Sequence, residues 1–352
     1  MKKIALLIIF SGLSIYLFGQ SKNIDSLVSN YAKNNNFNGT IIVQKDSNIL
    51  YHNSFGIANR QFEVPNRNET KYNIASISKL FTAVLILQLH EIGKIDLNQL
   101  IKTYLSNYKG EGAEKVTIHQ LLNHTSGIEN CEDIGSDVEI YRMPNTIDSI
   151  ITKYCSGKLR WEPGTKFSYN NSEYIILGKI IEELYKKPYE QVLSEMILQP
   201  LNMKNSGLVI HSKIIKNLAS GYWRDNKTKE YKNNPPLLIE NYHASAAIYS
   251  TASDLLKFSN GVFAGRLLTP SSLKLLLTTT LESQNYGYGL WVEYLRINKK
   301  VLPVAQRAGL IWGTKSLLTH FLDRDLTIIF VANTNTLDFY NFNKIIAEIV
   351  LE

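Results

Sequence analysis

The stretch YNIASISKLFTAVLILQL (Tyr72–Leu89) places a serine and a lysine, Ser76 and Lys79, three residues apart at the start of a nearly continuous apolar run. The length of this run and the glycine that closes it, Gly93, predict a buried helix over 74–93 that ends at a C′ glycine. Lysines are rarely fully buried without a partner, yet almost everything after Lys79 is apolar. Either Lys79 turns out to solvent, or it is held inside for chemistry.

A Ser-x-x-Lys pair can supply a nucleophile together with its base. Residues i and i+3 share one face of a helix, and the helix N-terminus favours negative charge on the serine oxygen. Apolar surroundings lower the pKa of a lysine, so that a neutral amine can accept the serine proton. The pattern alone is weak, because it also occurs at Ser106–Lys109 and Ser271–Lys274, where no long apolar helix follows. The alternative is a capping serine beside a solvated lysine.

A second candidate pair, Tyr169 and Asn171, follows a proline–glycine turn in EPGTKFSYNNSEYIILG (162–178). The same Tyr-x-Asn pattern at Tyr51 and Tyr231 lacks such a turn. A tyrosine hydroxyl near a lysine ammonium has its anionic form stabilised and can act as a base. Asn171 offers both an amide donor and a carbonyl acceptor to a substrate amide. The alternative for Tyr169 is a buried ring whose hydroxyl makes an ordinary hydrogen bond.

Length, composition and the N-terminus indicate an exported globular protein. The 352 residues are 44% hydrophobic and 20% charged, which suits one large domain or two closely packed subdomains. MKKIALLIIFSGLSIYLFG (1–19) has the basic and apolar regions of a secretory signal peptide, and an uncleaved membrane anchor is the alternative. The formal charge is +7 and the lysines are scattered, so nucleic acid is not an expected partner.

Neither the cysteines nor the histidines form a metal-binding pattern. Cys131 and Cys155 are the only cysteines, and after export they could form one disulfide or remain two buried thiols. His119 and His124 are five residues apart, which does not place them on one face of a helix. We therefore expect no metal ion and no cofactor.

The two ends of the chain carry strand patterns. FNGTIIVQKDSNILYHNSFGIANR (37–60) is rich in β-branched residues and predicts two strands joined by a tight turn at 45–48. Near the other end, consecutive antiparallel strands are predicted in YGYGLWVEYLRIN (286–298), VLPVAQRAGL (301–310) and KSLLTHFLDRDLTIIFVANT (315–334), before a final helix.

Between these ends the pattern is mostly helical, with two amphipathic helices separated at Pro188. Strands at both termini with helices between them predict an α/β (α+β) fold, in which an antiparallel sheet is flanked by helices. We expect one domain over 20–352, with a sheet subdomain of about 20–75 and 240–352 and a helical subdomain of about 76–239. A catalytic site would lie at the seam between the two subdomains.

The order and context of these pieces resemble the serine β-lactamase-like family, which includes class C β-lactamases, D-Ala-D-Ala carboxypeptidases and related esterases and peptidases. The resemblance covers about 37–333 and rests on SISK, YNN, DLNQLIKTYL, IHQLLNHTSGI, ILQPLNMKNSGL, STASDLLKF and YGYGLW. It implies the β-lactamase/D,D-peptidase fold and a serine hydrolase in which Ser76 is acylated. It also implies that Lys79 and Tyr169 share the base and acid roles and that Asn171 helps to hold substrate.

One element of the family pattern differs in this chain. Relatives carry Lys-Thr-Gly or His-x-Gly on the strand that lines the site, and the matching residues here are Arg307, Gly309 and Leu310. Gly309 would keep the backbone close to substrate, and the amide of Leu310 would join that of Ser76 as an oxyanion hole. A guanidinium can bind a substrate carboxylate through two parallel charge-assisted hydrogen bonds. The alternative is an arginine that turns away and pairs with a local acid.

The sequence therefore predicts an exported serine hydrolase, periplasmic or secreted, that forms an acyl-enzyme with a β-lactam, a D-amino-acid peptide or an ester. Its partner would be a small-molecule or peptide substrate, including fragments of peptidoglycan. We expect a monomer without a stable membrane span after cleavage of the signal peptide. His124 is expected in a structural turn, because the lysine–tyrosine pair leaves no role for another base. The alternative is a catalytically silent envelope-binding protein, in which Arg307 replaces a working group.

Overall fold

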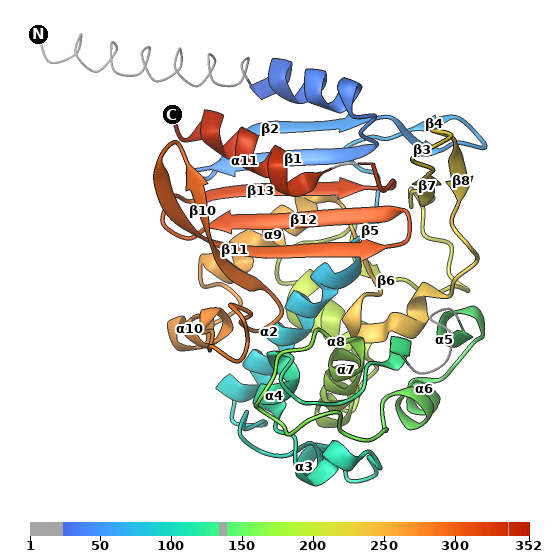
Figure 1. Cartoon of the computed structure of the whole chain (residues 1–352), viewed down its shortest axis with the longest axis vertical. Helices are drawn as coiled ribbons and strands as arrows, with labels where there is room; N and C mark the ends of the chain where they lie inside the picture. Colours follow the sequence, from blue (N-terminus) through green and yellow to red (C-terminus); the bar gives the residue numbers. More distant parts are fainter. Residues whose placement is uncertain (1–23, 134–138, 337) are drawn as a thin grey trace, which may run out of the picture.

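The computed structural model describes residues 24–133, 139–336 and 338–352, so the predicted signal peptide lies outside the described residues. Figure 1 shows a sheet with helices on both faces, next to a mostly helical part. Within the described residues, no helix is both long and apolar enough to cross a membrane.

One antiparallel sheet joins the two ends of the chain, as the sequence predicted. Its strand order is β10-β11-β12-β13-β1-β2, and β1 pairs along its whole length with β13. The strands are β1 (Gly39–Lys45), β2 (Asn48–Phe55), β10 (Trp291–Ile297), β11 (Lys300–Ile311), β12 (Thr314–Phe321) and β13 (Leu326–Ala332). The predicted turn between β1 and β2 is present, with Asp46 and Ser47 at φ of +48° and +64°, as tight hairpin turns require.

Both faces of the sheet are buried, which explains why its central strands are continuously hydrophobic. Along β1, Ile41 and Val43 belong to one core cluster and Ile42 to the other, because successive side chains of a strand point to opposite faces. The outer face is covered by a helix over 24–34 and by α11 (Phe339–Val350). The inner face is covered by α9 (Ala252–Phe263) and by the helix that follows the Ser-x-x-Lys motif (Figure 1).

That helix is buried on all sides. The chain first makes a 3₁₀ turn, η1 (Ala75–Ile77), and then enters α2 (Ser78–Glu91), so the predicted helix over 74–93 begins with a tighter turn at Ser76. Gly93 has φ of +69°, which confirms the predicted C′ glycine. A helix that is apolar all round belongs in a protein core, and α2 lies between the sheet and the helical part.

The remaining elements complete the fold. The helices are α3 (Ile101–Tyr104), α4 (Ile118–Leu122), α5 (Glu139–Arg142), α6 (Ile147–Tyr154), α7 (Asn171–Tyr185), α8 (Tyr189–Leu193), α9 (Ala252–Phe263) and α10 (Pro270–Leu277). Short helical turns are η2 (Glu111–Glu114), η3 (Cys131–Asp133), η4 (Ser194–Leu198) and η5 (Ile239–Ser245). The short strands are β3 (Ile57–Asn59), β4 (Val64–Pro65), β5 (Tyr72–Asn73), β6 (Gly207–Leu208), β7 (Tyr222–Arg224), β8 (Tyr231–Asn233) and β9 (Ile248–Ser250). The predicted helix break at Pro188 separates α7 from α8.

Candidate active site

Ser76 lies in the η1 turn, where α2 meets the sheet. The residue before it, Ala75, has φ of +48°, a left-handed conformation that is uncommon for residues other than glycine and is often found at functional sites. Two hydrogen bonds anchor this turn: the hydroxyl of Ser316 on β12 donates to the Ile74 carbonyl at 2.8 Å, and the Ile74 amide donates to Ile248 at 3.0 Å. The position of Ser76 is therefore set by the sheet and by β9 as well as by α2.

Lys79 is held inside the protein and has no exposed surface. Its ammonium donates to the Ser76 hydroxyl at 3.4 Å, to the Asn171 side-chain oxygen at 2.5 Å and to the Ser245 carbonyl at 3.1 Å. These three contacts use all three donors of an ammonium group. Burial lowers the pKa of Lys79, although the Tyr169 oxygen opposes this effect. Lys79 is thus placed between the serine and Asn171, one turn into the core.

Tyr169 reaches Ser76 from the segment just before α7. Its hydroxyl donates to Ser76 Oγ at 2.8 Å and accepts a hydrogen bond from Nη2 of Arg307 at 2.5 Å. Burial by itself would raise the pKa of Tyr169, but the charges of Arg307 and Lys79 lower it below its usual value. The structure therefore brings Ser76, Lys79 and Tyr169 into one hydrogen-bonded group.

Arg307 is buried in the same group, with 1% of its surface exposed. Besides its bond to Tyr169, its Nε donates to the Ser76 carbonyl at 2.7 Å. The guanidinium carbon lies 5.2 Å, 5.0 Å and 5.7 Å from the ring centres of Tyr169, Trp291 and Tyr286, within the range of cation–π contacts. Arg307 therefore points toward Ser76 and Tyr169 and is not turned away from them. No carboxylate of the described residues forms an ion pair with it.

Gly309 brings β11 against the turn that carries Ser76. A Cβ atom at this position would lie 2.3 Å from the Ile74 carbonyl oxygen and 3.1 Å from the Cβ of Ala75. A side chain here would push the strand away from Ser76, so this close approach requires glycine.

The backbone of Leu310 faces the open edge of β11. Strand β10 pairs with β11 only as far as Gln306, which leaves the edge beyond it unpaired. A two-residue turn joins β11 to β12, with Ile311 opposite Thr314 and Leu310 opposite Lys315. Because hydrogen-bonded and non-hydrogen-bonded pairs alternate in an antiparallel ladder, the Leu310 N–H points away from β12. The side chain of Leu310 is exposed on the other face of the sheet, so only its backbone can serve the site.

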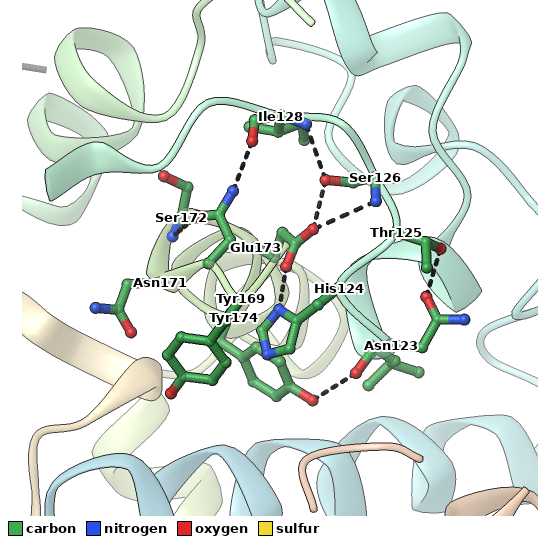
Figure 2. Close-up of polar contacts among 12 residues, drawn as sticks. Asn123, His124, Thr125, Ser126, Ile128, Tyr169, Asn171, Ser172, Glu173 and Tyr174 are labelled. Carbon is green, nitrogen blue, oxygen red and sulfur yellow. Dashed lines mark hydrogen bonds and ion pairs between the residues drawn. The ribbon is translucent and has the colours of Figure 1, made fainter. Parts of the chain in front are cut away.

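His124 and Glu173 form a second buried group, against the ring of Tyr169 (Figure 2). Nδ1 of His124 contacts the Glu173 carboxyl group, whose other oxygen accepts from the Ser126 hydroxyl at 2.5 Å. The His124 ring centre is 4.6 Å from that of Tyr169, and Nε2 lies 3.2 Å from the Tyr286 hydroxyl. Burial raises the pKa of Glu173 well above its usual value and lowers that of His124 well below its own.

The backbone of His124 also supports the segment that carries Tyr169. His124 has φ of +62°, and its carbonyl accepts from the amide of Ser168, the residue before Tyr169, at 2.9 Å. His124 therefore lies in a turn, as expected, and makes no hydrogen bond to Ser76. The turn has a more specific task than the sequence indicated, because it holds both the ring and the backbone of the Tyr169 segment.

Sequence reasoning missed three residues of this site: Glu173, Tyr286 and Trp291. Glu173 is in the first turn of α7, where an acid is ordinarily explained by the helix dipole. Its position two residues after the Tyr-x-Asn motif was the only available signal. Tyr286 precedes β10 and Trp291 is its first residue, both in the segment YGYGLW, where aromatic residues are also common for packing alone.

A serine, a lysine and a tyrosine are joined by hydrogen bonds beside an open strand edge. With the antiparallel sheet and its helices, this group defines the class of the protein as a serine hydrolase. The family model described as Beta-lactamase matches residues 24–350. The chain therefore belongs to the Beta-lactamase family.

The chain is similar to penicillin-binding proteins and to a D-amino acid amidase. Penicillin-binding protein 4* of Bacillus subtilis (strain 168) is 24% identical over 330 residues, which are 89% of this chain and 71% of that protein. The crystal structure of a penicillin-binding protein from Bacillus halodurans matches with a TM-score of 0.74 at 26% identity, over 86% of this chain and 92% of that chain. D-amino acid amidase from Ochrobactrum anthropi SV3, at 21% identity and a TM-score of 0.75, covers 95% of this chain and 98% of its own, and it shows the fold alone.

Proposed function

We propose that this protein is an exported acyl-transferring hydrolase that cleaves amides or esters of D-amino acids, with Ser76 as its nucleophile. One observation carries the proposal: Ser76 Oγ lies 2.8 Å from the Tyr169 hydroxyl and 3.4 Å from Lys79 Nζ. Lys79 is buried and Tyr169 is half-buried, and both have a pKa below the usual value. A base close in pKa to the working pH is the most effective kind.

The proton of Ser76 passes to Tyr169 as Oγ attacks the substrate carbonyl carbon. The positive charges of Arg307 and Lys79 stabilise the anionic form of Tyr169 that accepts it. The backbone N–H groups of Ser76 and Leu310 receive the oxyanion of the tetrahedral intermediate. Tyr169 then gives the proton to the leaving amine or alcohol, and water releases the acyl group by the same steps in reverse.

The substrate class is supported by the relatives and by the open strand edge. A penicillin-binding protein and a D-amino acid amidase share this fold, and a substrate backbone can lie along β11 beside Gly309. Asn171 keeps its side-chain N–H₂ group for a substrate carbonyl, since its oxygen is bonded to Lys79. All of these groups come from one chain, so we propose a site that is complete in a monomer and needs no cofactor.

Covalent labelling tests the nucleophile. The wild type treated with a fluorophosphonate should gain one adduct by intact mass, and Ser76→Ala should gain none. Ser106→Ala and Ser271→Ala are matched controls, because each changes the serine of another Ser-x-x-Lys pattern and lies at an exposed position; both should label like the wild type. A label that persists at another serine in Ser76→Ala would refute the assignment. A wild type without label, and without turnover on a panel of D-amino-acid esters and amides, would favour the silent binding protein.

Export is tested through the cysteines. Cys131 and Cys155 are fully buried free thiols that interact with each other. We propose that a thiol oxidase of the exporting compartment accepts two electrons and two protons from them, leaving one disulfide that stabilises the fold by roughly 3 kcal/mol. Protein recovered from the periplasm or the medium should lack residues 1–19 and two thiol hydrogens by non-reducing mass spectrometry. Two free thiols in periplasmic material would contradict the disulfide, and recovery only with membranes would favour an anchor.

A further inference from the structure

We propose that Arg307 is a positioning residue that holds Tyr169 and does not bind a substrate carboxylate. The enzyme would then cleave neutral amides and esters as efficiently as substrates that carry a carboxylate. This inference rests on the proposed function and specifies its substrate class. It also replaces the carboxylate-binding role that the sequence suggested for Arg307.

The first argument is that two of the three guanidinium nitrogens already have partners in the site. Nη2 donates to the Tyr169 hydroxyl and Nε donates to the Ser76 carbonyl. A carboxylate bound by two parallel hydrogen bonds needs two adjacent nitrogens on one edge of the guanidinium. Nε and Nη2 form one such edge, and both already donate within the site, so a carboxylate bound there would displace the hydrogen bond to Tyr169.

The second argument is access. Nη1, the remaining nitrogen, is buried and has no hydrogen-bond partner among the described residues. Only 1% of the surface of Arg307 is exposed, and the rings of Tyr169, Trp291 and Tyr286 stand around its guanidinium carbon. A substrate carboxylate could reach Nη1 only if this aromatic enclosure opened. Burying an N–H without a partner is costly, and here it is the consequence of keeping the cation against the tyrosine.

The third argument is the chemistry that a guanidinium supplies. Arginine stays protonated at every working pH, whereas lysine and histidine can lose their proton when buried. A fixed cation beside the Tyr169 oxygen lowers the pKa of Tyr169 whatever the protonation state of Lys79. Arg307 is therefore suited to hold the base ready, and this role does not depend on the charge of the substrate.

A pair of matched substrates tests the specificity on the wild type. The first is an N-acyl-D-alanyl ester of D-lactate, which ends in a carboxylate, and the second is the same ester of D-lactamide, which is neutral. We expect kcat/KM values within about threefold of each other, because no charged hydrogen bond distinguishes them. A preference of about thirtyfold or more for the lactate ester would overturn the inference.

Variants of Arg307 test the positioning role. Arg307→Met should lower kcat/KM for both esters by the same factor, about tenfold or more. It should also move the ascending limb of the pH profile to higher pH, because the pKa of Tyr169 rises when the cation is removed. Arg307→Lys, which keeps a charge, should shift the limb less. The matched control is Arg324→Met, which removes an exposed arginine from the β12–β13 turn and should leave the profile unchanged.

Two outcomes would refute the positioning role: an unshifted limb in a folded Arg307→Met protein, or a loss confined to the lactate ester. The pH dependence of the rate of labelling by a neutral fluorophosphonate measures the same ascending limb, and it requires no turnover of a substrate. A failure of the proposed function is distinct, since Ser76 would then not be labelled in the wild type at all.

Discussion

The two sides of Tyr169 differ in how their charges are compensated. Around its hydroxyl lie two buried cations, Lys79 and Arg307, and neither forms an ion pair with a carboxylate of the described residues. Against its ring lies His124, which pairs with Glu173. His124 is further bonded to Tyr286, and Glu173 to Ser126. One side has unbalanced charge, and the other has a balanced acid and base.

On the proposed mechanism, this difference separates the groups that react from the groups that support them. A carboxylate beside Lys79 and Arg307 would satisfy both cations and remove the field that lowers the pKa of Tyr169. The acid that the site does contain, Glu173, is directed to His124 and away from the hydroxyl (Figure 2). Burying charge without a counter-charge is costly. The unbalanced charge lies around the Tyr169 hydroxyl, whereas His124 and Glu173 each have hydrogen-bond partners.

The largest effect should come from breaking the reactive side. Tyr169→Phe and Lys79→Met should each lower kcat by at least ~10³, and the double variant should lose little more, because the two residues act on one proton. Steady-state kinetics on a D-amino-acid ester would measure this. Tyr51→Phe is the matched control, since it changes the tyrosine of another Tyr-x-Asn pattern, on β2 in the sheet. Additive losses, or an active Tyr169→Phe, would show that the two residues do not share the base role.

The reactive side could largely be predicted from the sequence. Ser76, Lys79 and Tyr169 occur in short patterns whose spacing carries chemical meaning, and the structure brings them together. The sheet was predictable for a similar reason, because strand residues alternate between two faces and both faces here are apolar.

The supporting side could not be predicted in the same way. Its contacts join residues far apart in the chain, such as Ser126 with Glu173 and His124 with Tyr286. No local spacing encodes such a contact. The role of Arg307 was equally hidden, because only the packing of Trp291 and Tyr286 decides whether its guanidinium faces the substrate or the tyrosine.

A second, smaller effect should come from breaking the supporting side. Glu173→Ala should lower the free energy of unfolding by roughly 4 kcal/mol, because it leaves His124 and Ser126 buried without their partner. Glu173→Gln should cost much less at neutral pH, since an amide can donate to His124 and accept from Ser126. Urea denaturation at pH 7.5 would measure both variants, and equal losses would show that Glu173 is needed for its charge.

The pH dependence of Glu173→Gln tests whether the pair is balanced. In the unfolded chain between pH 4.5 and 6.5, Glu173 has lost its proton and His124 carries one; in the folded pair the carboxyl has a raised pKa and the imidazole a lowered one. The pair thus holds one proton in both states, and its contribution to stability is flat in this window. In Glu173→Gln only the histidine remains, so the variant should lose up to ~2 kcal/mol more than the wild type as pH falls from 6.5 to 5. If the difference in free energy of unfolding between the wild type and Glu173→Gln stays constant over this pH range, the folded pair carries no proton.

His320 on β12 provides the smallest effect and the sharpest contrast with His124. It is a buried histidine that bonds to Thr327 Oγ1 at 2.9 Å and stacks on Phe263, and it forms no ion pair with an acid of the described residues. Burial lowers the pKa of His320 from 6.5 to about 4.

With no acid to share its proton, His320 should make the fold sensitive to acid. Below pH 6.5 the unfolded chain binds a proton at this residue that the folded state does not, so stability is lost as pH falls from 6.5 toward 4. His320→Gln keeps a hydrogen bond to Thr327 and does not titrate. Between pH 6.5 and pH 5, urea denaturation should show the wild type losing about 2 kcal/mol more than this variant. Because both proteins share every other titrating group, the difference isolates His320. If the free energy of unfolding changes with pH in parallel for the two proteins, His320 must be charged in the folded protein. A buried histidine without an acid partner would then add no pH dependence to stability, as is expected for the His124–Glu173 pair.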